Sequence, residues 1–324
     1  MTVLFAQGIH SKKDDRVFYH QKTTLEKQGI KVEIRSFFGD DMPFCKHIRH
    51  IRREITACKP DVVVCDTPKT VLAASGTGAR VIYDVTEWYP GHVALGRQNV
   101  FTPFKWCAMV LLNWLAGCKT DRFIFGETDK GKPFRFCFPW KRYVYMPYYP
   151  SKRFFLQSQI KPVGKQCNLF YAGPQTAGKG WTRVQETLRL CRHLRPDIDW
   201  QLIAISPDQY LPLPEFCNSL GNVHFALDLR DIDKETTRCL PIKLFYYMAS
   251  GCVPVYSDLK AIRQGVPEIE TCARLVTTAQ QAAKAIIDCL NSDTYCATAE
   301  AGRTLFEQKY NWETIEDRLT AIVA

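Results

Sequence analysis

The sequence predicts an α/β protein made of two doubly wound domains, each with a parallel sheet. Strand-length apolar runs alternate with helix-period segments through the chain, and the alternation starts again after Gly164. The length of 324 residues suits two domains of ordinary size. We expect the two domains to face each other across a cleft. Ligands of such sheets gather at the carboxyl ends of the strands.

The sequence of the first half predicts four strands, and a helix follows each of the first three. Gly29 is a helix stop signal, and Gly8 follows the first strand. Thr86 and Glu87 follow the fourth strand, so all three of these candidate site residues fall at carboxyl ends. The expected strands are 3–5, 31–36, 62–65 and 80–85, and the expected helices are 17–29, 47–58 and 67–75.

The second half repeats this pattern. Pro241 suits the first position of a helix, and Gly251 suits its left-handed C-cap. The domain boundary is expected between Tyr148 and Gly164, a proline-rich span with little periodicity. The expected strands are 169–172, 200–205, 223–227 and 253–256, and the expected helices are 182–194, 242–249, 280–290, 297–309 and 312–323.

Charge and cysteine content narrow the class of protein. Residues 1–160 hold 25 Lys and Arg against 14 Asp and Glu, a net charge of +11, whereas the remainder carries −1. This imbalance indicates an anionic partner for the first half, either nucleic acid or an anionic membrane leaflet, or simply a solvated basic surface. The fourteen cysteines form no CxxC or CxxxC pair, so we expect no metal site and a reduced, cytoplasmic protein. The apolar run at the start is too short for a signal peptide.

The stretch PIKLFYYMASGCVPVYSD, residues 241–258, resembles the donor-site helix of retaining nucleotide-sugar glycosyltransferases of family 4. Further segments resemble motifs of that family in the expected order. They are DDRVFYHQKTTLEKQGIKVEI, VIYDVTEWYP, LFYAGPQTAGKG, NVHF and KYNWETIEDRL. The combination of DVTEWYP with PIKLFYYMASG resembles the motifs of a subfamily of these enzymes that acts on bacterial surface polysaccharides.

The resemblance implies the GT-B fold, with two Rossmann-like domains. It implies an N-terminal acceptor-side domain at 1–160, a donor domain at 161–308, and a helix at 309–324 that returns to the first domain. The implied activity is metal-independent transfer, with retention, from a nucleotide-sugar to a polysaccharide, lipopolysaccharide or lipid-linked acceptor. No cofactor beyond this substrate is expected.

The resemblance also assigns donor-binding residues. Lys179, six residues after Gly173, matches the family's phosphate-binding lysine, and its glycine neighbours let the backbone approach a phosphate. The family's arginine after the first glycine is Pro174 here, and Lys243 could compensate from the start of its helix. Tyr246 replaces the glutamate that grips the donor ribose, and Arg238 stands where its partner glutamate is expected. Gly8 completes the expected donor-binding set.

Two residues after the fourth strand are the catalytic candidates. Thr86 stands where the family has a histidine near the transferred sugar, and Glu87 follows it. Threonine can hydrogen-bond a sugar hydroxyl but cannot act as a base near neutral pH. The resemblance implies that the leaving phosphate takes the acceptor proton. The missing histidine therefore need not abolish transferase activity. Asp84 is interpreted as a structural hydrogen-bonding residue. Arg16 could approach the cleft, but a solvated charge at the start of a helix is the favoured interpretation.

The most apolar stretch, Phe101 to Cys118, has two interpretations. A buried domain helix is favoured, and the alternative is an interfacial anchor, because the run is too short for the roughly 20 residues of a membrane span. Basic and aromatic residues that follow it suit a membrane headgroup region or single-stranded nucleic acid. Lipid-linked acceptors in the resembled family favour the membrane. The membrane or acceptor contacts we expect are Lys130, Lys132, Trp140, Lys141 and Arg142.

We therefore expect a cytoplasmic glycosyltransferase held at the inner face of a membrane, with no nucleic-acid partner. The alternative is a non-catalytic GT-B-like protein that binds a partner enzyme or glycan, because the paired glutamates and the histidine of the family are missing.

Overall fold

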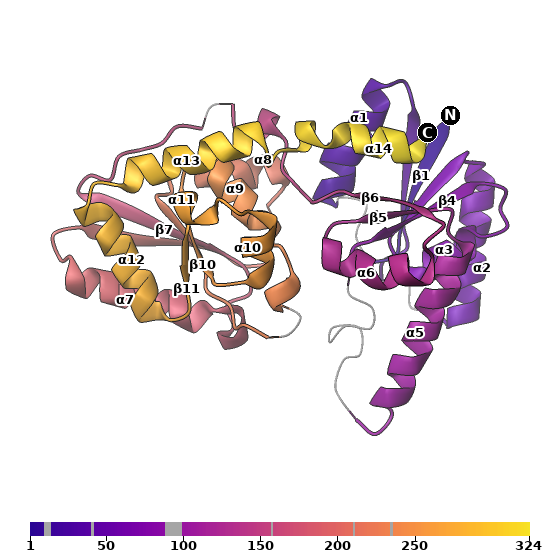
Figure 1. The fold of residues 1–324 in the computed structure, drawn as a ribbon, viewed down its shortest axis with the longest axis horizontal. Coiled ribbons are helices and arrows are strands. Elements are labelled where there is room, and N and C mark those ends of the chain that lie inside the picture. Colours follow the sequence, from indigo (N-terminus) through magenta and orange to yellow (C-terminus); the bar gives the residue numbers. More distant parts are fainter. Residues whose placement is uncertain (10–13, 40–41, 88–98, 157, 210, 234–235) are drawn as a thin grey trace. The chain divides into compact units, whose positions relative to one another are not determined.

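The computed structural model describes residues 1–324 except 10–13, 40–41, 88–98, 157, 210 and 234–235. The chain forms two compact units (Figure 1). Unit 1 comprises residues 1–148 and 315–324, and unit 2 comprises residues 149–314. Each unit holds one parallel sheet with helices packed on it.

Six parallel strands form the sheet of unit 1 in the order β2-β1-β3-β4-β5-β6. Its central strands are almost entirely buried, because runs such as VVVC and VIYDV present apolar side chains to helices on both faces. The strands are β1 (Thr2–Gln7), β2 (Lys31–Ser36), β3 (Val62–Cys65), β4 (Arg80–Val85), β5 (Arg122–Phe125) and β6 (Arg142–Tyr145).

The helices of unit 1 cover both faces of this sheet. A π-helix, η1 (Arg16–Gln21), continues into α1 (Lys22–Lys27), and α14 comes from the far end of the chain. Arg80 donates hydrogen bonds to the carbonyls of Val323 and Ala324, and Arg122 donates to Ile322 at 2.6 Å, which ties the end of α14 to the sheet. The remaining helices are α2 (Phe44–Cys58), α3 (Pro68–Ala74), α5 (Thr102–Lys119), α6 (Thr128–Cys137) and α14 (Glu316–Val323).

Unit 2 contains five parallel strands in the order β11-β10-β9-β7-β8. Trp200, Tyr171 and Phe225 are among the largest fully buried side chains of its core. The strands are β7 (Gln166–Ala172), β8 (Asp199–Ile205), β9 (Phe225–Asp228), β10 (Val253–Ser257) and β11 (Arg274–Val276). The helices are α7 (Trp181–Leu194), α8 (Leu213–Ser219), α9 (Ile242–Ser250), α10 (Lys260–Gly265), α11 (Ile269–Cys272), α12 (Ala279–Asn291) and α13 (Tyr295–Gln308), with single 3-10 turns η2 (Lys152–Phe154), η3 (Ala177–Lys179), η4 (Leu220–Asn222), η5 (Thr236–Arg238) and η6 (Trp312–Thr314).

The predicted fold class is confirmed, since both sheets are parallel and doubly wound. The eight expected strands are all present. The sequence prediction missed β5, β6 and β11, which have four, four and three residues and each begin with an arginine. Such short runs carry too little alternation to be separated from loops.

The favoured interpretation of Phe101 to Cys118 as a buried helix is wrong. The helix, α5, spans 18 residues, and only Asn113, Ala116 and Gly117 among them are buried. Its large side chains are exposed instead, for example 74% of Phe104 and 56% of Leu111. Apolar composition alone predicted a helix shielded from water, and the described residues of unit 1 do not cover its large side chains.

Candidate functional site

A cluster of charges lies at the carboxyl edge of the sheet in unit 2, where β7 and β9 end. Asp228, the last residue of β9, is buried, and both of its carboxylate oxygens accept hydrogen bonds from Arg230. Lys243 Nζ lies 3.3 Å from Asp228 Oδ2 and also donates to the carbonyl of Ala172 at the end of β7. One buried carboxylate therefore holds two cations at the edge where a ligand is expected.

The pKa values in this cluster report competing effects. Burial alone would raise the pKa of Asp228, but Lys243 and Arg230 outweigh it and hold that pKa below its ordinary value. Burial lowers the pKa of Lys243, against the attraction of Asp228, and the nearby charges of Arg230 and Lys179 lower it further. Excess positive charge at this edge thus favours an incoming anion.

The loop after β7 brings Lys179 to the same edge. Gly180 has a φ of +90°, and a Cβ there would lie 2.4 Å from the Leu229 backbone, so only glycine fits this approach. Tyr171 Oη lies 2.7 Å from the Pro174 carbonyl and 3.1 Å from that of Lys179, which fixes the loop. The Lys179 side chain remains exposed.

The predicted donor residues Gly173 and Lys243 meet at this edge. A Cβ on Gly173 would lie 3.1 Å from Tyr171 Oη and 3.7 Å from Lys243 Nζ, so the backbone there is closely approached. Lys243 sits in the first turn of α9, where a lysine opposes the helix dipole, and Asp228 supplies the compensating charge.

Tyr246 lies three residues after Lys243 on α9. Its ring is buried between Phe155 and Phe216, with ring centroids 6.0 and 5.7 Å away. At this position of α9 the protein therefore has no carboxylate that could bind the ribose hydroxyls of a donor.

In unit 1, Gly8 lies at the carboxyl end of β1. Its N–H donates to Asp66 Oδ1 at 2.6 Å, and the N–H of Ile9 donates to Oδ2 at 3.2 Å. A Cβ on Gly8 would lie 2.6 Å from Thr67 Oγ1, so this close turn requires glycine. Thr67 in turn caps α3. Gly8 belongs to unit 1, whereas the other predicted donor residues belong to unit 2.

Thr86 and Glu87 follow β4 at the same edge of unit 1. Thr86 is buried, and its carbonyl accepts a hydrogen bond from Lys130 Nζ at 2.6 Å, while Glu127 lies 3.3 Å from the same ammonium. The buried Thr86 hydroxyl has no hydrogen-bond partner among the described residues. Glu87 is exposed. The rest of the VIYDVTEWYP motif, residues 88–90, lies outside the described residues.

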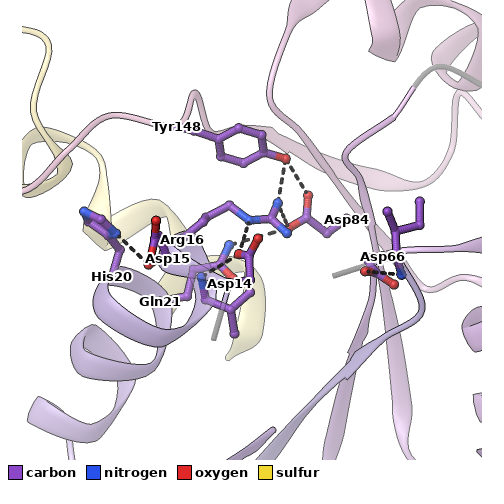
Figure 2. A network of polar contacts seen from close by, with 10 residues as sticks. Asp14, Asp15, Arg16, His20, Gln21, Asp66, Asp84 and Tyr148 are labelled. Carbon is purple, nitrogen blue, oxygen red and sulfur yellow. Dashed lines mark hydrogen bonds and ion pairs between the residues drawn. The ribbon is translucent and has the colours of Figure 1, made fainter. Parts of the chain in front are cut away.

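A polar network includes Asp84, two residues before Thr86, and the sequence predicted Asp84 as a hydrogen-bonding residue but not its partners (Figure 2). Arg16 Nη1 donates to Asp84 Oδ2 at 2.8 Å and to Tyr148 Oη at 2.6 Å, and Tyr148 Oη lies 3.3 Å from Asp84 Oδ1. Arg16 is therefore an interior charge rather than a solvated one. The network joins η1, β4 and the last residue of unit 1 before the chain enters unit 2.

The expected membrane or acceptor residues are not one group. Lys130 is buried against Thr86, which does not fit a membrane contact, and Lys141 donates to the carbonyls of Gly117 and Cys118 at 2.8 and 2.9 Å, closing the end of α5. Lys132 is exposed and pairs with Asp129 at 2.6 Å. Trp140, Lys141 and Arg142 line one surface pocket at the amino ends of the strands, opposite the edge that holds Gly8 and Thr86.

Two further observations concern ligands and membranes. Within the part of the chain that the structure describes, no group of three or more His, Cys, Asp or Glu side chains is placed to hold a metal ion. Among the described helices, none has the length and apolar character needed to cross a bilayer.

Two parallel doubly wound units of this kind define the GT-B fold, and comparison with solved structures shows that fold. Anabaena Alr3699/HepE in complex with UDP-glucose matches with a TM-score of 0.66 at 12% identity, over 99% of this chain and 98% of that one. The E. coli trehalose-6-phosphate protein bound with UDP-2-fluoro glucose matches with a TM-score of 0.70 at 8% identity, over 100% and 99%. A putative UDP-N-acetylglucosamine 2-epimerase from Listeria monocytogenes matches with a TM-score of 0.63 at 13% identity, over 99% and 95%.

No family model and no curated protein matches the chain.

Proposed function

We propose that this protein is a glycosyltransferase that moves a sugar from a nucleotide-sugar donor to a glycan acceptor. The observation that carries the proposal is the edge of unit 2 where Arg230 and Lys243 pair with Asp228, and where the charge of Lys179 acts on Lys243. It lies in a fold whose solved neighbours include one bound to UDP-glucose and one bound to UDP-2-fluoro glucose.

A departing nucleoside diphosphate carries the charge that such an edge can stabilise. The cations and the backbone amides at the start of α9 would stabilise the negative charge of the diphosphate in place of a metal ion. We therefore propose metal-independent transfer. Asp228 would orient Arg230 and Lys243 for this role. We propose retention of configuration on the basis of the family resemblance. The leaving phosphate would then take the acceptor proton, because the Thr86 hydroxyl cannot serve as a base near neutral pH.

The acceptor class we propose is a polysaccharide, lipopolysaccharide or lipid-linked sugar, met at the cytoplasmic face of an anionic membrane. Glu87 and Thr86 would face the acceptor from the carboxyl end of β4. The net charge of +11 on residues 1–160 supports an anionic surface as the partner.

Calorimetric titration with UDP tests the donor half of the proposal. Lys179→Ala should weaken UDP affinity by about tenfold or more, since one charge-assisted contact contributes about 1.5–3 kcal/mol. Lys165→Ala is the matched control, because that lysine is exposed and precedes β7 at the opposite edge of the sheet. Equal loss in both variants, or no UDP binding by the unmodified protein, would contradict the proposal.

A non-catalytic role in binding a partner enzyme or glycan is the second candidate. It is favoured by the buried aromatic setting of Tyr246, where the resembled family has a glutamate. The fold alone does not identify a glycosyltransferase, because the putative Listeria epimerase has the same fold. Mass-spectrometric detection of sugar transfer to added glycans, with UDP release, separates catalysis from binding alone.

A further inference from the structure

Helix α5 (Thr102–Lys119) presents an uncharged apolar face to solvent. At 100° per residue, Phe104, Leu111 and Leu115 fall on one stripe, and Trp114 and Val110 extend it along one side. The only charged residues of the helix are Lys105 and Lys119, near its two ends. Contiguous apolar surface of this kind marks a binding site. The α5 stripe consists of Phe104, Val110, Leu111, Trp114 and Leu115, whose exposed fractions run from 37% to 74%.

The opposite face of α5 is anchored mainly near its C-terminal end. Asn113 accepts a hydrogen bond from Tyr83 at 3.0 Å, and Gly117 packs so closely on Phe138 that a Cβ there would lie 2.3 Å from the ring. Lys141 holds the last carbonyls of the helix. Figure 1 shows the N-terminal half of α5 projecting beyond the other helices of unit 1. The stripe is thus displayed by a helix that packs on unit 1 through its C-terminal half.

The same helix forms one wall of a cavity at the carboxyl edge of the sheet. The cavity measures about 320 Å³, and Met109 and Leu112 of α5 contribute apolar surface to it. Gly8 and Thr67, which follow β1 and β3, bring polar groups from the opposite side. The remaining lining residues are Ile9, His47, Ile51, Pro68, Lys69 and Thr70. A ligand with a polar head and an apolar stem fits such a mixed wall.

Charge decides between the possible occupants of the stripe. A second copy of the chain would bring two halves of net charge +11 together, whereas an anionic leaflet complements that charge. Exposed cations lie on the neighbouring α2 and α6, and Trp140 is exposed near the end of α5 that Lys141 closes. Tryptophan and lysine at the margin of an apolar face are typical of helices that lie in a membrane interface.

We propose that α5 lies flat in the interface of an anionic bilayer with its stripe among the lipid chains, and that the acceptor is a sugar carried on a membrane lipid. Its sugar would enter the cavity beside Gly8, and its lipid stem would follow Met109 and Leu112 back to the bilayer. This inference rests on the proposed function for the transfer itself, but the docking of α5 does not.

Vesicle sedimentation tests the docking surface. The full chain should sediment with vesicles of phosphatidylcholine containing 30% phosphatidylglycerol and much less with phosphatidylcholine alone. Leu111→Glu and Trp114→Glu should each lower the partition coefficient at least tenfold, whereas Leu194→Glu, an exposed position on α7, should leave it unchanged. All three variants should bind UDP as the unmodified protein does.

Three outcomes would overturn the docking proposal. They are no sedimentation of the unmodified protein, equal sedimentation of stripe and control variants, and a dimer in analytical ultracentrifugation that Leu111→Glu dissociates. Loss of UDP binding by every form would instead reject the proposed function and leave the docking result standing.

The acceptor class is tested by titration with two soluble probes that share one sugar. Octyl glucoside, kept below its micelle concentration, should bind at least tenfold more tightly than methyl glucoside. Met109→Ser and Leu112→Ser should each reduce that preference, and Leu156→Ser, at an exposed position of unit 2, should not. Equal affinities for the two probes, or a preference unchanged in both cavity variants, would contradict a lipid-linked acceptor.

Discussion

Arg230 grips Asp228 through both carboxylate oxygens at the carboxyl end of β9, with Nε 2.7 Å from Oδ1. The strand ends on the carboxylate and the arginine follows two residues later, so the pair forms locally. Ser257 donates to the Arg230 carbonyl at 2.7 Å, and Arg183 donates to it at 3.1 Å, which fixes the backbone as well. The guanidinium is thereby aimed before any ligand arrives, so binding an anion there costs little reorganisation.

Asp228→Asn should lower the free energy of unfolding by about 3 kcal/mol at pH 7, because two cations lose a charged partner. The pKa of Asp228 is depressed, so its contribution is present above the unfolded pKa near 4 and is lost as pH falls through the lower folded value. Urea denaturation at pH 7 and pH 3 should therefore show a smaller difference between the two proteins in acid. A constant difference would contradict an ionised Asp228.

Arg230→Gln should weaken UDP binding about tenfold, corresponding to one charge-assisted contact of about 1.4 kcal/mol or more. Glutamine keeps a donor for Asp228 but removes the charge. Arg195→Gln serves as the control, since that arginine pairs with Asp197 at 2.7 Å where α7 ends, away from this edge. Isothermal calorimetry at two salt concentrations should show a smaller salt dependence for Arg230→Gln only.

The sequence predicted the α/β class, which is confirmed. The family resemblance grouped Gly173, Lys179 and Lys243, which the structure places at one edge of one sheet, and their role in donor binding stays a prediction. We did not predict the pairing of Asp228 with Arg230 from the sequence, although a carboxylate directly after the apolar run FAL, with an arginine two residues later, was a usable signal. The exposure of α5 could not be predicted from its composition. An apolar sequence is equally compatible with a helix buried in protein and with one that contacts lipid. The burial of Arg16 could not be predicted from local sequence, because its partners Asp84 and Tyr148 lie 68 and 132 residues away along the chain.

Tyr246→Glu should destabilise the protein by several kcal/mol rather than restore ribose binding. The side chain is only 7% exposed and packs on Phe155 and Phe216, so a carboxylate there would be buried among aromatic rings. Tyr246→Phe keeps the ring packing and should cost about 1 kcal/mol. Thermal unfolding measures both changes. A stable Tyr246→Glu variant that binds UDP more tightly would show instead that this position faces the donor.

Arg16→Gln should lower the free energy of unfolding by about 3 kcal/mol at pH 7, because it leaves Asp84 buried without its cation. Burial raises the pKa of Asp84, and Arg16 opposes that rise, so the variant should hold the carboxyl group neutral to a higher pH. A raised folded pKa gives stability below the unfolded value that is lost as pH rises, and the cost of Arg16→Gln should therefore shrink between pH 7 and pH 4. Tyr148→Phe, which removes one hydrogen bond and no charge, should cost about 1 kcal/mol at both pH values. Urea denaturation of the unmodified protein and the two variants measures these costs, and a cost of Arg16→Gln that is the same at pH 7 and pH 4 would mean that Asp84 is already protonated in the native network.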